Sequence, residues 1–122
     1  MSVVNVKVAH IRPQYKDLRD WMSHEDNVYI GRGGVVFVAT SSGGKVRWPT
    51  NASKWCNKHK VSTIMSRDEA IALYEKDLDV LLKDGDNRVQ FMQLRGKNLG
   101  CWCKPEKCHG DVILRKLDEM QQ

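Results

Sequence analysis

The chain has 122 residues, of which 41% are apolar and 29% charged, and its net charge is +5 with a pI of about 9.1. This balance is typical of one globular domain over residues 1–122, and a chain of this length can bury roughly two-thirds of its unfolded surface. It excludes a membrane span and a secretory signal, since no apolar run is long enough for either. We therefore expect an intracellular, cytoplasmic protein with reduced thiols.

The first thirty residues predict two short strands separated by a helix. Residues 3–9 have strand composition with partial alternation of apolar side chains. Residues 15–22 carry apolar side chains at three- and four-residue spacing, which predicts a short helix. Residues 28–31 predict the second strand. The glycine-containing segment 31–34 then predicts a turn, because glycine tolerates positive φ.

The next segment predicts a hairpin and a long loop. Residues 35–39 and 45–49 have strand composition and are separated by the loop TSSGG. Residues 49–60 lack periodicity and contain the densest group of lysines, with Trp55 and His59 among them. Long irregular loops in small domains are usually functional, so we expect a functional loop here, the alternative being a solvated one.

Two helices are predicted after this loop. Ser66 and Glu69 have capping-box spacing at the start of the first helix. Its apolar side consists of Ala70, Ile71, Leu73, Tyr74, Leu78, Leu81 and Leu82. Residues 89–97 predict the second helix, with Gly96 at its C-terminus. Its inward side chains would be Val89, Met92 and Leu94.

The C-terminal segments complete the predicted fold. Residues 98–103 predict a buried strand, and residues 108–120 predict the last helix. Strands that alternate with helices indicate the α/β class, here a single compact domain with a short mixed or parallel sheet flanked by helices, a Rossmann-like sandwich. Ligands bind beyond the carboxyl ends of strands in such sheets, so we expect a site at the loops after the second and the last strand.

Residues 99–112, LGCWCKPEKCHGDV, contain three of the four cysteines and a histidine. If the strand runs through residue 103, Cys101 and Cys103 face one side and the intervening tryptophan faces the other. Cys108 and His109 then lie at the N-terminus of the last helix, where the helix dipole favours anions and lowers a thiol pKa.

This segment has two interpretations that involve metal or covalent chemistry. Cys101, Cys103, Cys108 and His109 are the ligand types of tetrahedral zinc, although their spacing departs from the usual zinc motifs. Alternatively, Cys108 is a nucleophile with His109 as its base or as the group that orients it. The phosphatase signature fails, because Arg115 follows Cys108 after six residues instead of five.

The preferred interpretation is cysteine packing beside an anion site. His109 and the backbone amides of His109, Gly110 and Asp111 would bind a phosphate or carboxylate at the helix terminus. Arg32, between glycines in GRGG, would contact the phosphate from the other loop. The segment GRGG is too short for a dinucleotide fingerprint.

The basic loop supplies two further candidate residues. Lys54 would contact phosphate, and Trp55, which lies inside the basic segment, would stack on a base. The same combination of lysines and an aromatic side chain fits a nucleic acid backbone, which is the competing partner for this loop.

Four segments together resemble the domain of unknown function family 4326, whose members occur in bacteria, phages and large DNA viruses. They are VYIGRGG, the Ser-Lys-Trp-x-Asn of SKWCNKHKV, SRDEAIALYEKDL and LRGKNLGCWCKPEKCHGDVILRKL, between residues 28 and 117. The family loop commonly reads Gly-Asn-Pro-Phe where this chain has Cys-Asn-Lys-His at residues 56–59, so only Asn57 is carried over. The resemblance implies a compact α/β domain but no reaction. The site that it implies lies around Arg32, Asn57, Cys103, Cys108 and His109.

These observations lead to three functional hypotheses. The first is a small α/β protein that binds a nucleotide-like or phosphate-bearing ligand, with no favoured cofactor. No paired carboxylates or recognisable triad assign an enzymatic reaction to it, and catalysis stays open. The first alternative is a zinc-stabilised basic module that binds nucleic acid. The second is a structural or assembly protein of a virus or phage, with a protein partner; we expect no membrane partner.

Overall fold

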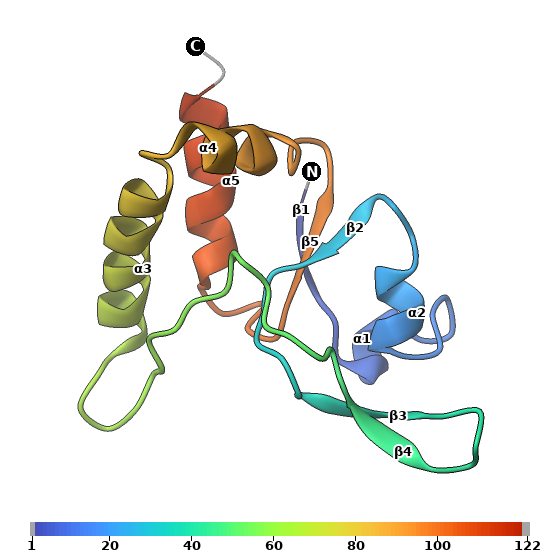
Figure 1. The fold of residues 1–122 in the computed structure, drawn as a ribbon. Coiled ribbons are helices and arrows are strands. Elements are labelled where there is room, and N and C mark those ends of the chain that lie inside the picture. The colour runs from blue at the N-terminus through green and yellow to red at the C-terminus, as the bar shows by residue number, and fades with distance from the viewer. Residues whose placement is uncertain (1, 121–122) are drawn as a thin grey trace.

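The computed structural model describes residues 2–120 and has an α/β architecture (Figure 1). Its elements in chain order are β1 (Ser2–Asn5), α1 (Val8–Ile11), α2 (Leu18–Met22), β2 (Asn27–Tyr29), β3 (Val36–Ala39), β4 (Lys45–Trp48), α3 (Arg67–Leu81), α4 (Gly85–Met92), β5 (Asn98–Cys101) and α5 (His109–Glu119). Within residues 2–120, no helix combines the length and apolar composition that crossing a membrane requires.

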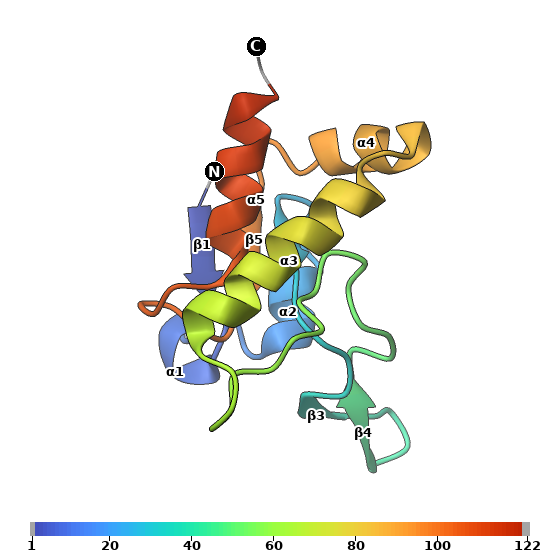
Figure 2. The same ribbon diagram turned by 90° about the vertical axis from the view of Figure 1, so that its left-hand side faces the viewer.

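The main sheet has three parallel strands, with β5 between β1 and β2. Leu99 of β5 is in register with Val3 of β1 and with Val28 of β2. The helices α3, α4 and α5 lie on one face of this sheet, and α1 and α2 lie on the other (Figures 1 and 2). The predicted α/β class, with a short sheet flanked by helices, is confirmed; the Rossmann-like detail stays a prediction.

Side chains of β5 alternate between two apolar clusters, one on each face of the sheet. Leu99 and Cys101 belong to the cluster under α3, α4 and α5. Gly100 faces the other way, toward Trp21 of α2. A Cβ atom on Gly100 would lie 2.6 Å from the Trp21 ring, so this strand position requires glycine for its space. The central strand therefore connects both clusters.

The first strand is shorter than predicted. The sequence indicated a strand through residue 9, but β1 ends at Asn5 and α1 (Val8–Ile11) follows. Asn5 Oδ1 accepts a hydrogen bond from the Lys7 N–H at 3.0 Å. Such a side-chain turn competes with continued strand pairing, which explains why the apolar composition of this segment misled the prediction.

The following helix and strand lie where they were predicted, with tighter bounds. The Asp17 carboxylate accepts the Asp20 N–H at 2.9 Å and caps α2, so the helix begins at Leu18 instead of residue 15. The strand β2 ends at Tyr29 instead of residue 31. Residues 15–17, which were predicted to be helical, therefore lie before α2.

The predicted hairpin is confirmed. β3 and β4 pair in antiparallel orientation and project from the rest of the molecule (Figure 1). Gly34, just before β3, has a φ of 66°, which is the positive φ predicted for the glycine turn. The hairpin thus begins immediately after the loop that follows β2.

The helix after Ser66 is confirmed, with half of its predicted capping box. Ser66 Oγ accepts the Glu69 N–H at 3.1 Å. The reciprocal contact differs, because the Glu69 carboxylate accepts from the Ser66 hydroxyl and not from its backbone amide. The cap still satisfies one of the amides that a helix start leaves unpaired.

The second helix begins earlier than predicted and presents a different face. Asp84 caps α4 by accepting the Asn87 N–H at 3.0 Å, so the helix starts at Gly85. In this register Phe91 is fully buried, whereas Val89, predicted to point inward, is 62% exposed. Leu94 is buried as predicted, and Gly96 has a φ of 80° in the turn after the helix.

Candidate functional site

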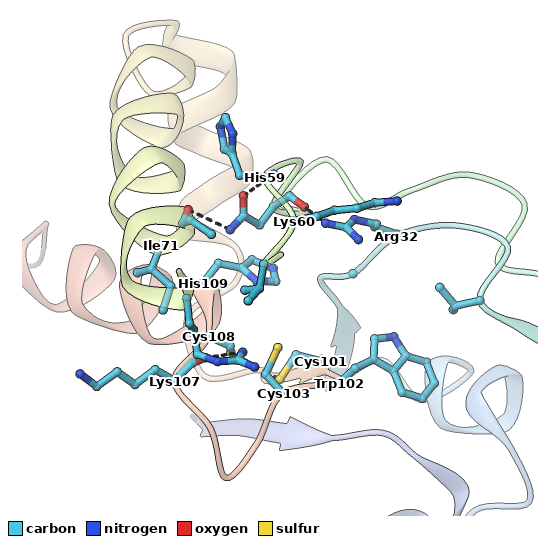
Figure 3. Close-up of a pocket in the computed structure, with 16 residues that line it drawn as sticks. Arg32, His59, Lys60, Ile71, Cys101, Trp102, Cys103, Lys107, Cys108 and His109 are labelled. Carbon is cyan, nitrogen blue, oxygen red and sulfur yellow. Dashed lines mark hydrogen bonds between the residues drawn. The ribbon is translucent and has the colours of Figure 1, made fainter. Parts of the chain in front are cut away.

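A cavity of about 360 Å³ lies where the parallel strands β2 and β5 end (Figure 3). Four segments form its wall: the loop after β2, residues 57–61, the start of α3 and the connection from β5 to α5. The predicted site residues that line this cavity are Arg32, Asn57, Cys101, Cys103, Cys108 and His109. The structure thus brings together the two loops that the sequence analysis selected.

Asn57 connects three segments of the wall. Its Nδ2 donates to the Ala70 carbonyl oxygen at 3.1 Å, and its Oδ1 accepts the His59 N–H at 2.9 Å. Its backbone carbonyl accepts from Arg32 Nη2 at 3.2 Å. Asn57 therefore fixes its own loop against α3 and orients the Arg32 guanidinium at the cavity.

His109 is buried at the start of α5. Its Nε2 donates to the Ile30 carbonyl oxygen at 2.8 Å, and its ring packs edge-on against Tyr74 with 4.9 Å between ring centroids. Because a carbonyl oxygen only accepts, Nε2 carries the proton, and Nδ1 of the neutral ring has a free lone pair. Burial lowers the pKa of His109, which favours this neutral form.

Cys101 and Cys108 form a buried thiol pair, with their sulfur atoms 3.4 Å apart. The Cys108 thiol donates to Cys101, which lowers the pKa of Cys101 to about 6 and raises the pKa of Cys108. Backbone amides of Cys103 and Lys104 also stabilise the Cys101 thiolate. From its place at a helix N-terminus, Cys108 was predicted to have the lowered thiol pKa, but in the thiol pair it is Cys101 whose pKa is lowered.

Cys108 caps α5, and this cap occupies the helix terminus. Its Sγ accepts the Gly110 N–H at 3.3 Å, and its own N–H donates to Asp111 Oδ2 at 3.2 Å. Asp111 Oδ1 also lies 2.6 Å from Lys104 Nζ. The expectation that Gly110 and Asp111 present amides to an anion is therefore corrected, because a sulfur atom already accepts the Gly110 amide and a carboxylate lies at the terminus.

The four predicted zinc ligands are near one another but do not form a tetrahedral set. Two of them, Cys101 and Cys108, contact each other, and His109 donates to the backbone. Among residues 2–120, no group of three or more His, Cys, Asp or Glu side chains is placed to hold a metal ion.

Lys54 and Trp55 lie outside the cavity wall. Trp55 is only 7% exposed and packs edge-on against Phe91, with ring centroids 5.3 Å apart. Lys54 Nζ donates to Gln90 Oε1 on α4 at 2.9 Å. The expected stacking role of Trp55 is therefore corrected, because the loop folds its ring into the core under α4.

Three basic residues of the wall were missed by the sequence analysis: Lys60, Arg67 and Lys107. Arg67, the first residue of α3, donates from Nη1 to the Lys107 carbonyl oxygen at 3.1 Å. Together with Arg32 they give the wall four lysines and arginines, and no aspartate or glutamate among the described residues lines it. A usable signal was the position of Arg67 at a predicted helix start.

A chain of hydrogen bonds supports the loop that carries Arg32. Trp102 Nε1 donates to Tyr29 Oη at 2.7 Å, and Tyr29 Oη donates to the Arg32 carbonyl oxygen at 2.8 Å. Burial raises the pKa of Tyr29, which keeps its hydroxyl protonated and able to donate. Trp102 also lines the cavity, so the two loops are linked at its rim.

Comparison with known proteins gives one family and one relative. The family model described as Domain of unknown function (DUF4326) matches residues 14–119, which confirms the resemblance seen in the sequence. An uncharacterized 12.4 kDa protein in the nrdA-td intergenic region of Enterobacteria phage T4 is 47% identical over 56 residues, which cover 45% of this chain and 52% of the phage protein. The chain thus spans about half the length of that curated relative. No solved structure matches the chain.

Proposed function

We propose that this chain, which belongs to the family described as Domain of unknown function (DUF4326), binds a small phosphate-bearing ligand in the cavity beside His109. One observation carries the proposal: lysines and arginines line the described cavity wall without any carboxylate. Such a wall has a positive potential that favours an anion. Lys107 Nζ lies 3.6 Å from Asp68 Oδ1 outside the wall, whereas Arg32, Lys60 and Arg67 form no ion pair with a carboxylate among the described residues.

The basic side chains retain donors for an anion. Arg32 uses Nη2 for the Asn57 carbonyl, and Arg67 uses Nη1 for the Lys107 carbonyl. A guanidinium has five N–H donors, so each arginine has further donors with which to hold phosphate oxygens. The preference for a phosphate follows from these forked donors, which match its oxygens better than single ammonium groups do.

The remaining wall suits a nucleoside or another partly apolar group. Val35, Val61, Ile71 and Trp102 contribute apolar surface. Trp102, which is half-buried at the rim, takes the stacking role first assigned to Trp55. His109 Nδ1 would accept from a ligand hydroxyl or amino group. The volume of about 360 Å³ lies within the range of small-molecule pockets, roughly 300–1,000 Å³, and favours one mononucleotide-sized ligand.

Isothermal titration with inorganic phosphate, nucleosides and their mono-, di- and triphosphates tests the proposal. We expect a phosphorylated nucleoside to bind at least about tenfold more tightly than the nucleoside, equivalent to about 1.4 kcal/mol. Arg32→Gln and Lys60→Ala should each weaken binding, whereas Lys58→Ala, an exposed lysine outside the cavity wall, should not. Absence of binding at millimolar concentration, or equal losses in Lys60→Ala and Lys58→Ala, would contradict the proposal.

The same preparations distinguish the alternative functions. DNA binding that weakens with salt and is not displaced by nucleotides would favour a nucleic-acid-binding module. Stoichiometric zinc in protein purified without a metal-affinity step would favour its zinc-stabilised form. A stable complex with a phage structural protein, together with an empty cavity, would favour the assembly role. Each of these outcomes would favour the corresponding alternative over binding of a small phosphate-bearing ligand.

A further inference from the structure

The buried thiol pair Cys101–Cys108 lines the cavity but has no role in the proposed ligand binding. Cys101 ends the central strand β5, and Cys108 caps α5, so rigid elements hold both sulfur atoms. They are 3.4 Å apart, and a disulfide requires about 2.05 Å. Both residues line the cavity although they are only 1% and 2% exposed, so a reagent reaches them through the cavity and not across the outer surface.

We propose that Cys101 and Cys108 are a peroxide-oxidisable pair that closes reversibly to a disulfide. The Cys101 thiolate attacks one oxygen of a hydroperoxide, an S–O bond forms, and the O–O bond breaks. The leaving oxygen takes a proton and departs as an alcohol, or as water when hydrogen peroxide is the oxidant. Cys101 is then a sulfenic acid.

The second step forms the disulfide. The Cys108 sulfur attacks the Cys101 sulfur, the S–S bond forms, and the S–O bond breaks. The hydroxide leaves with the proton of Cys108 as water. In sum, two thiols lose two electrons and two protons, and the hydroperoxide accepts them. A dithiol reductant restores both cysteines by thiol–disulfide exchange.

Hydrogen bonds assign the two roles. Cys101 Sγ accepts the Cys108 thiol at 3.4 Å, whereas Cys108 Sγ accepts the Gly110 N–H at 3.3 Å. The backbone amides of Cys103 and Lys104 also favour the Cys101 thiolate, so the negative charge is best stabilised on Cys101. Cys108 holds the remaining proton and is the resolving thiol. The sulfur atoms must approach by about 1.3 Å. Residues 105–107 of the connection are exposed and can accommodate this movement.

The remaining cysteines provide internal controls. Cys103 is half-buried and lines the cavity, whereas Cys56 is half-buried and is not part of the cavity wall. Neither makes a sulfur–sulfur contact among the described hydrogen bonds. A link through Cys103 would therefore show that the connection rearranges, and that the observed pair is not the reactive one.

Peptide mapping of the full chain tests the proposal directly. The protein is treated with hydrogen peroxide, blocked with N-ethylmaleimide and digested with trypsin without reductant. Cleavage after Lys107 places Cys108 on residues 108–115, whereas Cys101 and Cys103 stay together on residues 98–107. We expect these two peptides to be linked, the fragment spectrum to assign the bond to Cys101, and dithiothreitol to release it.

Two variants complete the test. Cys103→Ser should keep the link. Cys108→Ser should abolish it and leave a sulfenic acid on Cys101 that a dimedone probe labels; serine also caps helices, so this variant retains the start of α5. Unlinked, fully blocked cysteines after peroxide treatment of the wild-type protein, or a link that Cys103→Ser removes, would overturn the proposal.

Discussion

His109 Nε2 donates to the Ile30 carbonyl oxygen at 2.8 Å, which joins the start of α5 to the end of β2 across 79 positions of the chain. The bond is buried, and it links the two loops at which the sequence analysis placed a site. The His109 imidazole therefore fixes the spacing between these loops together with the hydrogen bonds from Trp102 to Tyr29 and from Tyr29 to Arg32.

Replacing His109 with phenylalanine removes this bond and keeps the edge-on contact with Tyr74. We expect the free energy of unfolding to fall by about 1–3 kcal/mol, because the Ile30 carbonyl loses its side-chain donor in a buried position. Urea unfolding measures the loss. His10→Phe, at an exposed position of α1, is the matched control and should change stability by less than about 0.5 kcal/mol. Equal effects of the two variants would show that the bond contributes no stability.

Acid should destabilise the protein through the same histidine. Burial lowers the pKa of folded His109 below its ordinary value of 6.5, so below that pH the unfolded chain binds more protons than the folded one. The contribution of His109 is complete above pH 6.5 and is lost as the pH falls toward the folded pKa. Thermal unfolding between pH 7 and pH 5 should show this loss in the wild-type protein and a smaller loss in His109→Phe. Parallel curves would contradict it.

The thiol pair should make the free energy of unfolding depend on pH from about pH 6 upward. Cys101 has a folded pKa of about 6 and an ordinary value of 9.0, so between these values the unfolded chain binds one more proton, and stability rises with pH. Above 9.0 the raised pKa of Cys108 reverses the sign, since the folded chain then retains a proton that the unfolded chain has lost. The slope is at most about 1.4 kcal/mol per pH unit.

Urea unfolding of the reduced protein, in the presence of a phosphine reductant, measures the free energy of unfolding at each pH. The rise from pH 6 to pH 9 should vanish in the double variant Cys101→Ala with Cys108→Ser, while Cys103→Ser should retain it. A rise of the same size in the double variant would assign the pH dependence to other groups.

Gly100→Ala should destabilise the protein through overpacking. The added Cβ would lie 2.6 Å from the Trp21 ring and 2.8 Å from Val6, so the sheet and α2 must separate. We expect a loss of about 1–3 kcal/mol. Gly85→Ala is the matched control: its Cβ would come no nearer than 3.7 Å to another side chain, and alanine there should add about 0.4–1 kcal/mol. Thermal denaturation compares the two; a stable Gly100→Ala variant would contradict the packing that we describe.

Asn57→Ala should weaken both the fold and the cavity. It removes the donor to the Ala70 carbonyl and the acceptor of the His59 N–H, at an expected loss of about 1–3 kcal/mol. The variant keeps the backbone carbonyl that accepts from Arg32, but the side-chain bonds that hold this carbonyl in place are lost, so phosphate binding should weaken as well. Asn51→Ala, an exposed position in the same loop, should change neither quantity. Unchanged ligand affinity in Asn57→Ala would show that the loop does not position Arg32.

Local signals in the sequence predicted much of the fold. The Ser66 cap, the hairpin and the strand-to-helix order of the C-terminal segment each depend on neighbouring residues, and each lies where it was predicted. The predictions failed where a side chain competed with the pattern. Asn5 turned the chain out of β1, and Asp84 started α4 early, so that Phe91 replaced Val89 in the core.

The site was harder to predict than the fold, because its chemistry depends on distant contacts. Cys108 was expected to have the lowered thiol pKa from its place on a helix, but its partner Cys101 decides which thiol loses its proton. Trp55 was predicted to stack on a ligand because lysines lie beside it in the sequence. Only its contact with Phe91, which is distant in sequence, shows that its ring belongs to the core. The sequence marks Arg67 as the first residue of a helix, but its place in the wall depends on the packing of that helix start against the connection before α5.

The central place of β5 has a consequence for how the molecule is synthesised. Within residues 2–120, β1 and β2 do not pair with each other, and each pairs only with residues of β5. During translation from the N-terminus, the first two strands therefore emerge long before the strand that joins them, and their edges stay unpaired. The cavity floor is supplied by the same later segment, so the sheet and the site are completed together, once β5 has been made.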